Sequence, residues 1–199
     1  MRASGLLMHL TSLPGPYGVG TMGKAAYEFV DFLEAAGQKY WQILPLTTTS
    51  YGDSPYQSFS ARAGNPNFID FAELIEAGYL EQRDIDGVYL GSDPSNVDYG
   101  AIFGGRRQIL DRAAERFAAD KPADFDDFIQ ANEDWLIPYC EFMTVKEECG
   151  LKAFWEWPAE LRTRGEASAK VCADHPARML YHQMTQYFFD RQWSRLKAY

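Results

Sequence analysis

The pattern of apolar and polar positions begins with two short apolar runs, at residues 5–10 and 40–46, each followed by a loop rich in Pro, Gly or hydroxyl-bearing residues. Short apolar runs bounded by such loops are typical of strands that are buried on both faces. We therefore predict two fully buried strands in these segments.

A helix is predicted between the two runs, and Gly37 stands where its C-terminal cap belongs. The apolar positions have the spacing of an amphipathic helix, at Phe29, Phe32, Leu33 and Ala36. A strand–helix–strand unit pairs its strands in parallel and places ligand-binding loops beyond their carboxyl ends. The loops at residues 11–18 and 51–59 should therefore converge on one face.

From about residue 72 the pattern becomes mainly helical. Residues 106–119 carry one apolar face, formed by Ile109, Leu110, Ala113 and Phe117. Residues 124–148 repeat the pattern, but Pro138 is expected to kink or restart that helix. A third helix is predicted over residues 177–199, with an apolar stripe at Leu180, Met184, Tyr187 and Phe188.

Composition and charge narrow the range of partners. The 199 residues are 46% hydrophobic, which is enough for a sizeable core in one domain, or in one domain with a small subdomain. The net charge is −9 and no Lys/Arg cluster is present, so nucleic acid and anionic membranes are poor partners. The apolar run near the N-terminus is too short for a signal segment, and no stretch is long enough to span a bilayer. We expect a cytoplasmic protein.

The cysteines and the acidic runs are assigned no chemistry. Cys140, Cys149 and Cys172 are odd in number and lack metal-ligand spacing, which predicts reduced thiols and no metal site. No cofactor is assigned to the chain. We place two acidic runs on solvated helix faces, namely Asp124, Asp126 and Asp127, and Glu147 and Glu148.

The candidate chemistry lies in residues 51–59, where aromatic rings alternate with a carboxylate, an amide and hydroxyls. Rings offer flat apolar faces to a sugar, and the polar groups can hydrogen-bond its hydroxyls. The competing interpretation is a turn in which Asp53 and Ser54 satisfy nearby backbone N–H groups. Both interpretations of these two residues stay open.

The sequence of residues 51–59, YGDSPYQSF, resembles the signature of the 4-alpha-glucanotransferases, the amylomaltase or disproportionating enzymes. The resemblance continues in HLTSLPGPYG at residues 9–18, YWQILPL at 40–46, AGNP at 63–66 and FFDRQW at 188–193, and so spans the chain. It implies an enzyme that transfers α-1,4-glucan segments between maltooligosaccharides, or glucans derived from starch or glycogen, with retention of configuration.

The fold implied by this resemblance is α/β: an incomplete (β/α)8 TIM-type barrel with an inserted, mainly helical subdomain. A full barrel needs roughly 250 residues, and only two barrel-type strands can be counted here. We divide the chain into the start of the barrel at residues 1–71, the inserted subdomain at 72–176 and a helix returning to the barrel at 177–199. In the family, both catalytic carboxylates lie downstream, so no catalytic residue is assigned and the isolated chain is expected to be inactive.

The resemblance also assigns substrate-binding roles. Tyr56 corresponds to a ring platform, with Ser54, Asp53 and Gln57 as polar contacts. An accessory glucan site that uses two tyrosines in some relatives corresponds to Tyr51 and Phe103, where one phenol hydroxyl is lost. The turn before the motif also departs from the family, because residues 47–50 read TTTS instead of a Gly/Pro-containing turn.

Two other functions are weighed against this one. The first is a non-catalytic glucan-binding protein. The second is a dinucleotide-binding domain, suggested by the glycines of residues 18–23, but these lie too far from the preceding strand and no acidic residue follows at the distance that a ribose contact needs.

Two further features have two interpretations each. His9, at the end of the first predicted strand, either contacts substrate or is a buried neutral donor that holds a loop. Trp155 and Trp157 are either a second sugar platform or packing beneath the helical segment. The oligomeric state is left open.

Overall fold

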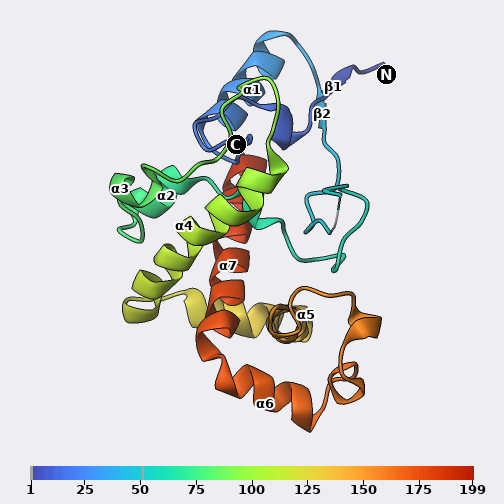
Figure 1. Ribbon diagram of the computed structural model, residues 1–199. Coiled ribbons are helices and arrows are strands. Elements are labelled where there is room, and N and C mark those ends of the chain that lie inside the picture. The colour runs from blue at the N-terminus through green and yellow to red at the C-terminus, as the bar shows by residue number, and fades with distance from the viewer. Residues whose placement is uncertain (1, 51) are drawn as a thin grey trace. The chain divides into compact units, whose positions relative to one another are not determined.

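The computed structural model describes residues 2–50 and 52–199 and is rich in helices, with a small parallel sheet (Figure 1). The chain forms two compact units. The first contains the described residues up to Ala113 together with Phe188–Tyr199, and the second contains Ala114–Tyr187. Helices α4 (Tyr99–Ala119) and α7 (Pro176–Ala198) each contribute residues to both units.

The predicted strand–helix–strand unit opens the first unit. Strands β1 (Gly5–Leu7) and β2 (Tyr40–Gln42) pair in parallel, with Gly5 opposite Tyr40, and α1 (Lys24–Ala35) connects them. The predicted cap at Gly37 is confirmed. Gly37 has φ 68° and donates its N–H to Glu34 O, while Gln38 donates to Leu33 O, which satisfies carbonyls at the end of α1.

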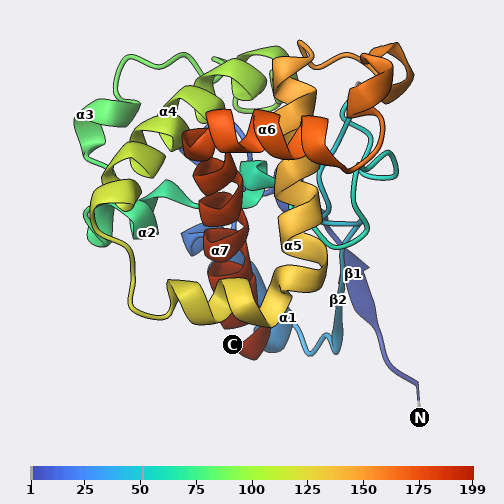
Figure 2. The same ribbon diagram turned by 90° about the horizontal axis from the view of Figure 1, so that it is seen from below.

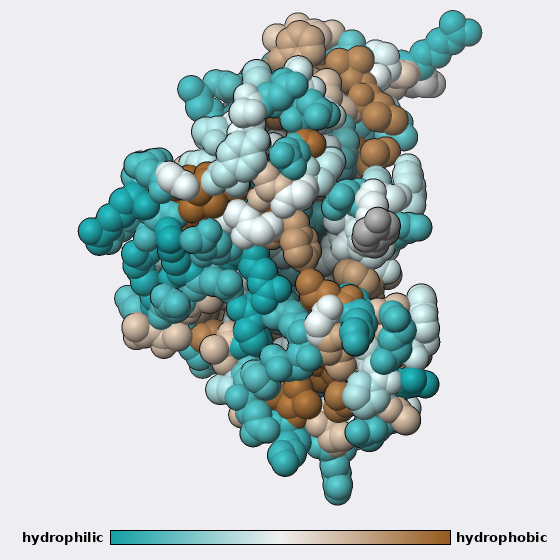
Figure 3. Space-filling view, in the orientation of Figure 1, coloured by the Kyte–Doolittle hydropathy of each residue, from teal (hydrophilic) through white to brown (hydrophobic). Residues whose placement is uncertain are grey.

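The prediction that both strands are fully buried is wrong. Leu6 is 40% exposed, Leu7 59% and Tyr40 66%, and Phe32 on α1 is 54% exposed as well. Figure 3 shows hydrophobic residues on the surface in the region where Figure 1 places β1 and β2. The physical reason is that the described sheet has only two strands, too few to bury their own apolar faces.

The core of the first unit lies around the short helices that follow β2. These are the 3₁₀ turn η2 (Pro66–Phe68), α2 (Phe71–Glu76) and α3 (Gln82–Ile85). Phe68, Phe71 and Leu74 are at most 2% exposed. Arg106, 1% exposed, donates to the carbonyls of Tyr17 and Ile69, and its guanidinium lies 4.1 Å from the Phe71 ring centroid, so the charge is buried with partners.

Helix α4 begins earlier than the predicted range of residues 106–119. The Asp98 carboxylate accepts a hydrogen bond of 2.9 Å from the Ala101 N–H in the first turn. The first turns of α4 contain Gly100, Gly104 and Gly105. Glycine lowers helix propensity, so the start of α4 is not apparent from the sequence. The predicted apolar face is confirmed, because its four members are at most 1% exposed.

The second unit is built from α5 (Phe125–Glu148), α6 (Glu166–Asp174) and the first part of α7, with short 3₁₀ turns η3 (Phe154–Glu156) and η4 (Ala159–Leu161). Helix α6 packs against α5. Helix α5 continues through Pro138 without restarting, but its axis changes direction partway along in both ribbon views (Figure 1 and Figure 2). A kink is what a missing N–H and a ring clash produce inside a helix.

Candidate functional site

The loop after β2 is closed at its base by backbone pairing. Thr47 and Gly64 form an antiparallel bridge, the Thr48 N–H donates to Ala63 O at 3.1 Å, and the Asn65 N–H donates to Leu46 O at 2.9 Å. A Cβ at residue 64 would lie 2.2 Å from the Phe189 ring, so this position requires glycine. The segments AGNP (residues 63–66) and FFDRQW (residues 188–193), which both resemble the family sequence, are therefore in contact and hold the loop.

Inside the loop, backbone and hydroxyl hydrogen bonds fix the turn. The Ser50 N–H donates to Gln57 O, and the Gln57 N–H donates to Ser54 O, both at 3.0 Å. The hydroxyls of Thr48 and Ser58 lie 3.1 Å apart, and Ser58 Oγ donates to Ser60 O at 2.6 Å. The serine-rich segment thus acts mainly as scaffold for the aromatic residues around it.

The side chain of Ser54 satisfies a backbone N–H of the turn, as the competing interpretation predicts, whereas Asp53 takes part in the turn through its backbone. Asp53 has φ 55°, a left-handed conformation that Asp tolerates better than most side chains, and its N–H donates to Ser50 O. Ser54 Oγ accepts from the Tyr56 N–H at 3.3 Å. Asp53 is also one of the residues that line a cavity.

This cavity lies at the carboxyl ends of β1 and β2 and has a volume of about 200 Å³. Its lining residues after β1 include His9, Thr11 and Ser12. Those after β2 include Asp53 and Pro55. The prediction that the two loops converge on one face is confirmed.

His9 forms part of the cavity wall and is only partly exposed. Its ring meets Phe68 edge-on, with centroids 5.4 Å apart and planes at 88°. The Nδ1 atom is buried and has no hydrogen-bond partner among the described residues, and the side chain does not cap the 3₁₀ turn η1 (Leu10–Ser12) that follows. Burial lowers the pKa of His9, so the imidazole is neutral at physiological pH.

The other residues assigned to substrate binding lie outside this cavity lining. Tyr56 presents its ring to solvent at 73% exposure, and Gln57 is exposed beside it. Phe103 lies on α4 and is 61% exposed. Tyr51, its partner in the accessory pair, lies outside the described residues.

Sequence reasoning left His9 undecided and missed Tyr99, which also lines the cavity. The position of His9 directly after an apolar run was a usable signal. Tyr99 had none, because α4 brings it to the cavity from a distant part of the chain.

The glycine-rich stretch at residues 18–23 is packed against a carboxylate of the protein itself. A Cβ at Gly23 would lie 2.0 Å from Asp70 Oδ2, and that oxygen accepts a hydrogen bond from the Thr21 hydroxyl. Asp70 Oδ1 accepts from the Ala72 N–H at 2.9 Å. A negative side chain therefore lies at the start of α1, where a dinucleotide would need to place its phosphates.

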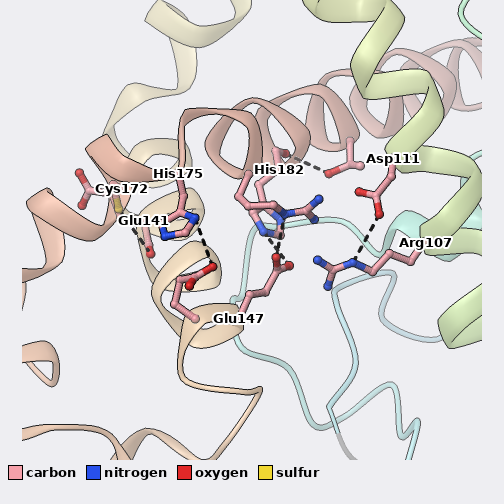
Figure 4. Close-up of polar contacts among 10 residues, drawn as sticks. Arg107, Asp111, Glu141, Glu147, Cys172, His175 and His182 are labelled. Carbon is pink, nitrogen blue, oxygen red and sulfur yellow. Dashed lines mark hydrogen bonds and ion pairs between the residues drawn. The ribbon is translucent and has the colours of Figure 1, made fainter.

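The second unit contains a cluster of polar contacts between α5 and α7 (Figure 4). Glu147 accepts from Arg178 Nε at 2.8 Å and lies 3.1 Å from His182 Nε2, with side-chain exposures of 9%, 21% and 4% respectively. The placement of Glu147 on a solvated face is therefore wrong. Buried carboxylates need partners, and the charge of Glu147 is met by groups that only the fold brings near.

Cys172 and His175 lie three residues apart in the sequence but contact separate partners. His175 Nδ1 lies 3.3 Å from Glu148, whereas Cys172 Sγ faces the Glu141 carbonyl at 3.9 Å (Figure 4). Within residues 2–50 and 52–199, no group of three His, Cys, Asp or Glu side chains could hold a metal ion. None of the helices in this part of the chain has the length and apolar content needed to cross a membrane.

The two tryptophans of residues 155–157 have different environments. Trp157 is 3% exposed and packs on Phe142 with ring centroids 5.3 Å apart. The packing interpretation is therefore right for Trp157. Trp155 is 70% exposed.

Comparison with known proteins places this site in a family. The family model described as 4-alpha-glucanotransferase matches residues 8–199, and the chain belongs to that family. The chain is 51% identical over 201 residues to the 4-alpha-glucanotransferase of Streptococcus pneumoniae serotype 4, covering 100% of this chain and 40% of that protein. It is 43% identical over 202 residues to the Thermus thermophilus 4-alpha-glucanotransferase, covering 99% of this chain and 39% of that protein.

The structure is similar to a solved amylomaltase from Streptococcus agalactiae, determined in complex with acarbose. The TM-score is 0.93 at 48% identity, over 100% of this chain and 41% of the other. The chain thus spans about 40% of the length of the relatives that it matches.

Proposed function

We propose that the chain is the N-terminal part of a retaining 4-alpha-glucanotransferase and supplies glucan-binding loops to its active site. The observation that carries this proposal is the cavity at the carboxyl ends of the parallel strands β1 and β2. The loops after these two strands, both of which resemble the family sequence, meet there. Ligand sites of (β/α)8 barrels are built at this end of the strands. A neutral glucan also suits a chain with a net charge of −9.

We further propose that β1 and β2 are the first strands of an incomplete (β/α)8 barrel. Their exposed apolar side chains, Leu6, Leu7 and Tyr40, are what the remaining strands and helices of such a barrel would cover. Within this proposal residues 1–71 begin the barrel, residues 72–176 form the inserted subdomain, and residues 177–199 lead back to the barrel.

Binding roles are proposed for the loop after β2. The exposed ring of Tyr56 is available to stack on a glucose unit, while Asp53 contributes a carboxylate to the cavity and Gln57 an exposed amide. Ser54 contributes chiefly by holding the turn. The accessory pair would retain Phe103 as an exposed stacking face.

The chemistry of glycosyl transfer requires a second component that the cavity lacks. Retention uses two carboxyl groups about 5–5.5 Å apart, one as nucleophile and one as acid and then base. Among the described residues that line the cavity, Asp53 is the one carboxylate. We therefore propose that both catalytic groups lie in the part of the enzyme that this chain does not span.

A non-catalytic glucan-binding protein is the weaker alternative, because the relatives covering this chain are named as transferases. A cytoplasmic location and glucan partners, without nucleic acid or membrane, belong to the same proposal.

A chimera tests the proposed function. In it, residues 1–199 replace the matching segment of the Streptococcus pneumoniae relative, to which they are 51% identical. We expect the chimera to convert maltotriose into shorter and longer maltooligosaccharides. A folded chimera that binds no maltooligosaccharide and makes no product would contradict the proposal.

A further inference from the structure

One face of the sheet formed by β1 and β2 is covered by α1. Side chains of residues that are paired in register lie on the same face of a sheet, and successive residues along a strand alternate between the two faces. Leu6 is paired with Trp41, and the Trp41 ring meets the Phe29 ring of α1 with centroids 5.0 Å apart and planes at 67°. Helix α1 therefore packs on the face that carries Leu6 and Trp41.

The opposite face of the sheet is exposed. It carries Leu7 of β1 and Tyr40 and Gln42 of β2, because these residues alternate with Leu6 and Trp41. Leu7 is 59% exposed and Tyr40 66%, and Gln42 is exposed as well. We call the surface formed by Leu7, Tyr40 and Gln42 the open sheet face. Large apolar side chains gathered on an exposed surface mark a site of interaction.

Both edges of the sheet are also open within the described part of the chain. The described sheet consists of β1 and β2, so each strand has one strand neighbour and one edge that faces no other strand. Such an edge presents a row of N–H and C=O groups to any chain that can continue the sheet. A partner that fits this region therefore supplies strands for the edges together with apolar side chains for the open sheet face.

Tyr199 lies against α1, the helix that packs on the sheet. Its hydroxyl donates to Asp31 Oδ1 at 2.6 Å, and its ring meets the Tyr27 ring edge-on with centroids 5.1 Å apart. The relatives are longer than this chain, which spans about 40% of their length. In them, the segment that follows the position of Tyr199 starts beside α1 and close to the sheet.

We propose that the open sheet face and the two strand edges are a docking surface for the remaining part of a 4-alpha-glucanotransferase, which binds here even when it is supplied as a separate chain. The inference rests on the proposed function and names the partner that completes it. Apolar burial and strand pairing need no covalent link, because a link only raises the effective concentration of the two parts. A second copy of this chain is a poorer occupant, because its two-stranded sheet brings too few strands to close a barrel of eight.

Co-expression of two separate chains tests this docking. One is the full 199-residue chain with an affinity tag, and the other is the part of the Streptococcus pneumoniae relative that follows its matching segment. We expect an equimolar complex that disproportionates maltotriose. The chimera joins the same two parts in one chain and controls for their compatibility. An active chimera whose separate parts do not co-purify would overturn this inference alone, whereas a folded chimera that neither binds nor transfers would overturn the proposed function.

Two matched variants of the tagged chain locate the docking surface. Tyr40→Lys places a charge on the open sheet face, and Tyr89→Lys places one at another tyrosine of the same unit, with exposures of 66% and 61% in the unmodified chain. Burying an unpaired ammonium is costly, so Tyr40→Lys should lower the amount of co-purified partner at least about tenfold. Tyr89→Lys should leave this amount unchanged. Equal amounts of partner with the two variants would overturn the proposal.

Hydrogen exchange gives a measurement that needs no variant. In the complex, backbone amides of residues 5–7 and 40–42 should exchange at least about tenfold more slowly than in the chain alone, because strand pairing and burial protect them. Protection confined to residues outside the two strands would overturn the proposal. A homodimer of this chain that excludes the partner would overturn it as well, in favour of a second copy as the occupant.

Discussion

The side chain of Gln192 forms two hydrogen bonds with the backbone of Asp70, which lies 122 residues earlier in the chain. Gln192 Oε1 accepts from the Asp70 N–H at 2.7 Å, and Nε2 donates to the Asp70 carbonyl at 3.0 Å. Gln192 is fully buried. The last part of α7 therefore fixes the residue whose carboxylate closes the glycine-rich turn before α1.

Removing this amide should destabilise the first unit. Gln192→Met keeps the side-chain length but leaves a buried N–H and a buried carbonyl of Asp70 without partners, which costs about 1–3 kcal/mol for each group. We expect the melting temperature of the chimera to fall by several degrees, as measured by calorimetry. Gln130→Met, at an exposed position of α5, is the matched control and should change little. Equal melting temperatures for the two variants would show that the Gln192 bonds contribute nothing.

Tyr56 should affect transfer without affecting stability. Its ring is 73% exposed, so Tyr56→Ala removes little packing. If the ring stacks on glucose, a contact worth roughly 0.5–1.5 kcal/mol is lost, and kcat/KM of the chimera for maltotriose should fall several-fold. Tyr89→Ala, which truncates another exposed ring, should leave the kinetics unchanged. Identical kinetics in both variants would remove Tyr56 from the site.

The exposed sheet should make the isolated chain bind hydrophobic dye and associate as concentration rises, because open strand edges and apolar patches favour contact between copies. Leu7→Ser alters a β1 side chain that is 59% exposed and should reduce dye binding. Leu151→Ser, at 41% exposure in the second unit, should reduce it less. A monodisperse chain with a sharp two-state transition and no dye binding is the result that contradicts this expectation.

The lowered pKa of His9 gives stability a pH dependence of known sign. Burial holds the native pKa of His9 below its usual value of about 6.5. At a pH between the native pKa and 6.5, His9 therefore binds a proton in the unfolded chain but not in the native chain. Stability is therefore fully present above pH 6.5 and falls as the pH drops below it. Asn at position 9 cannot titrate, so His9→Asn should weaken the fall in the free energy of unfolding of the chimera below pH 6.5, as measured by urea denaturation at several pH values. An unchanged slope below pH 6.5 would show that His9 is not the group responsible.

Local patterns predicted the two strands and the longer helices of this fold, but not the short helices α2, α3 and α6 or what covers the strands. The spacing of residues 29–36 and the glycine after them correctly predicted α1 and its cap, and Pro138 correctly predicted the bend in α5. The exposure of Leu7 was missed, because an apolar run indicates what a strand requires and not whether its neighbours are present in the chain.

The candidate site was also predicted only in part. The convergence of the loops after β1 and β2 follows from parallel pairing and was predicted. Two contacts between distant segments were not, namely the approach of Tyr99 to the cavity and the partners of Glu147 on α7. Both depend on the packing of helices across long sequence separations, for which spacing along the chain carries no signal.

We propose that this chain contributes glucan-binding loops, whereas the catalytic carboxylates lie in the part of the enzyme that it does not span. The most direct test is to incubate the purified 199-residue chain with maltotriose beside the chimera and to separate the products by chromatography. We expect longer and shorter maltooligosaccharides from the chimera and none from the isolated chain. Sustained disproportionation by the isolated chain, lost again in Asp53→Asn, would contradict it.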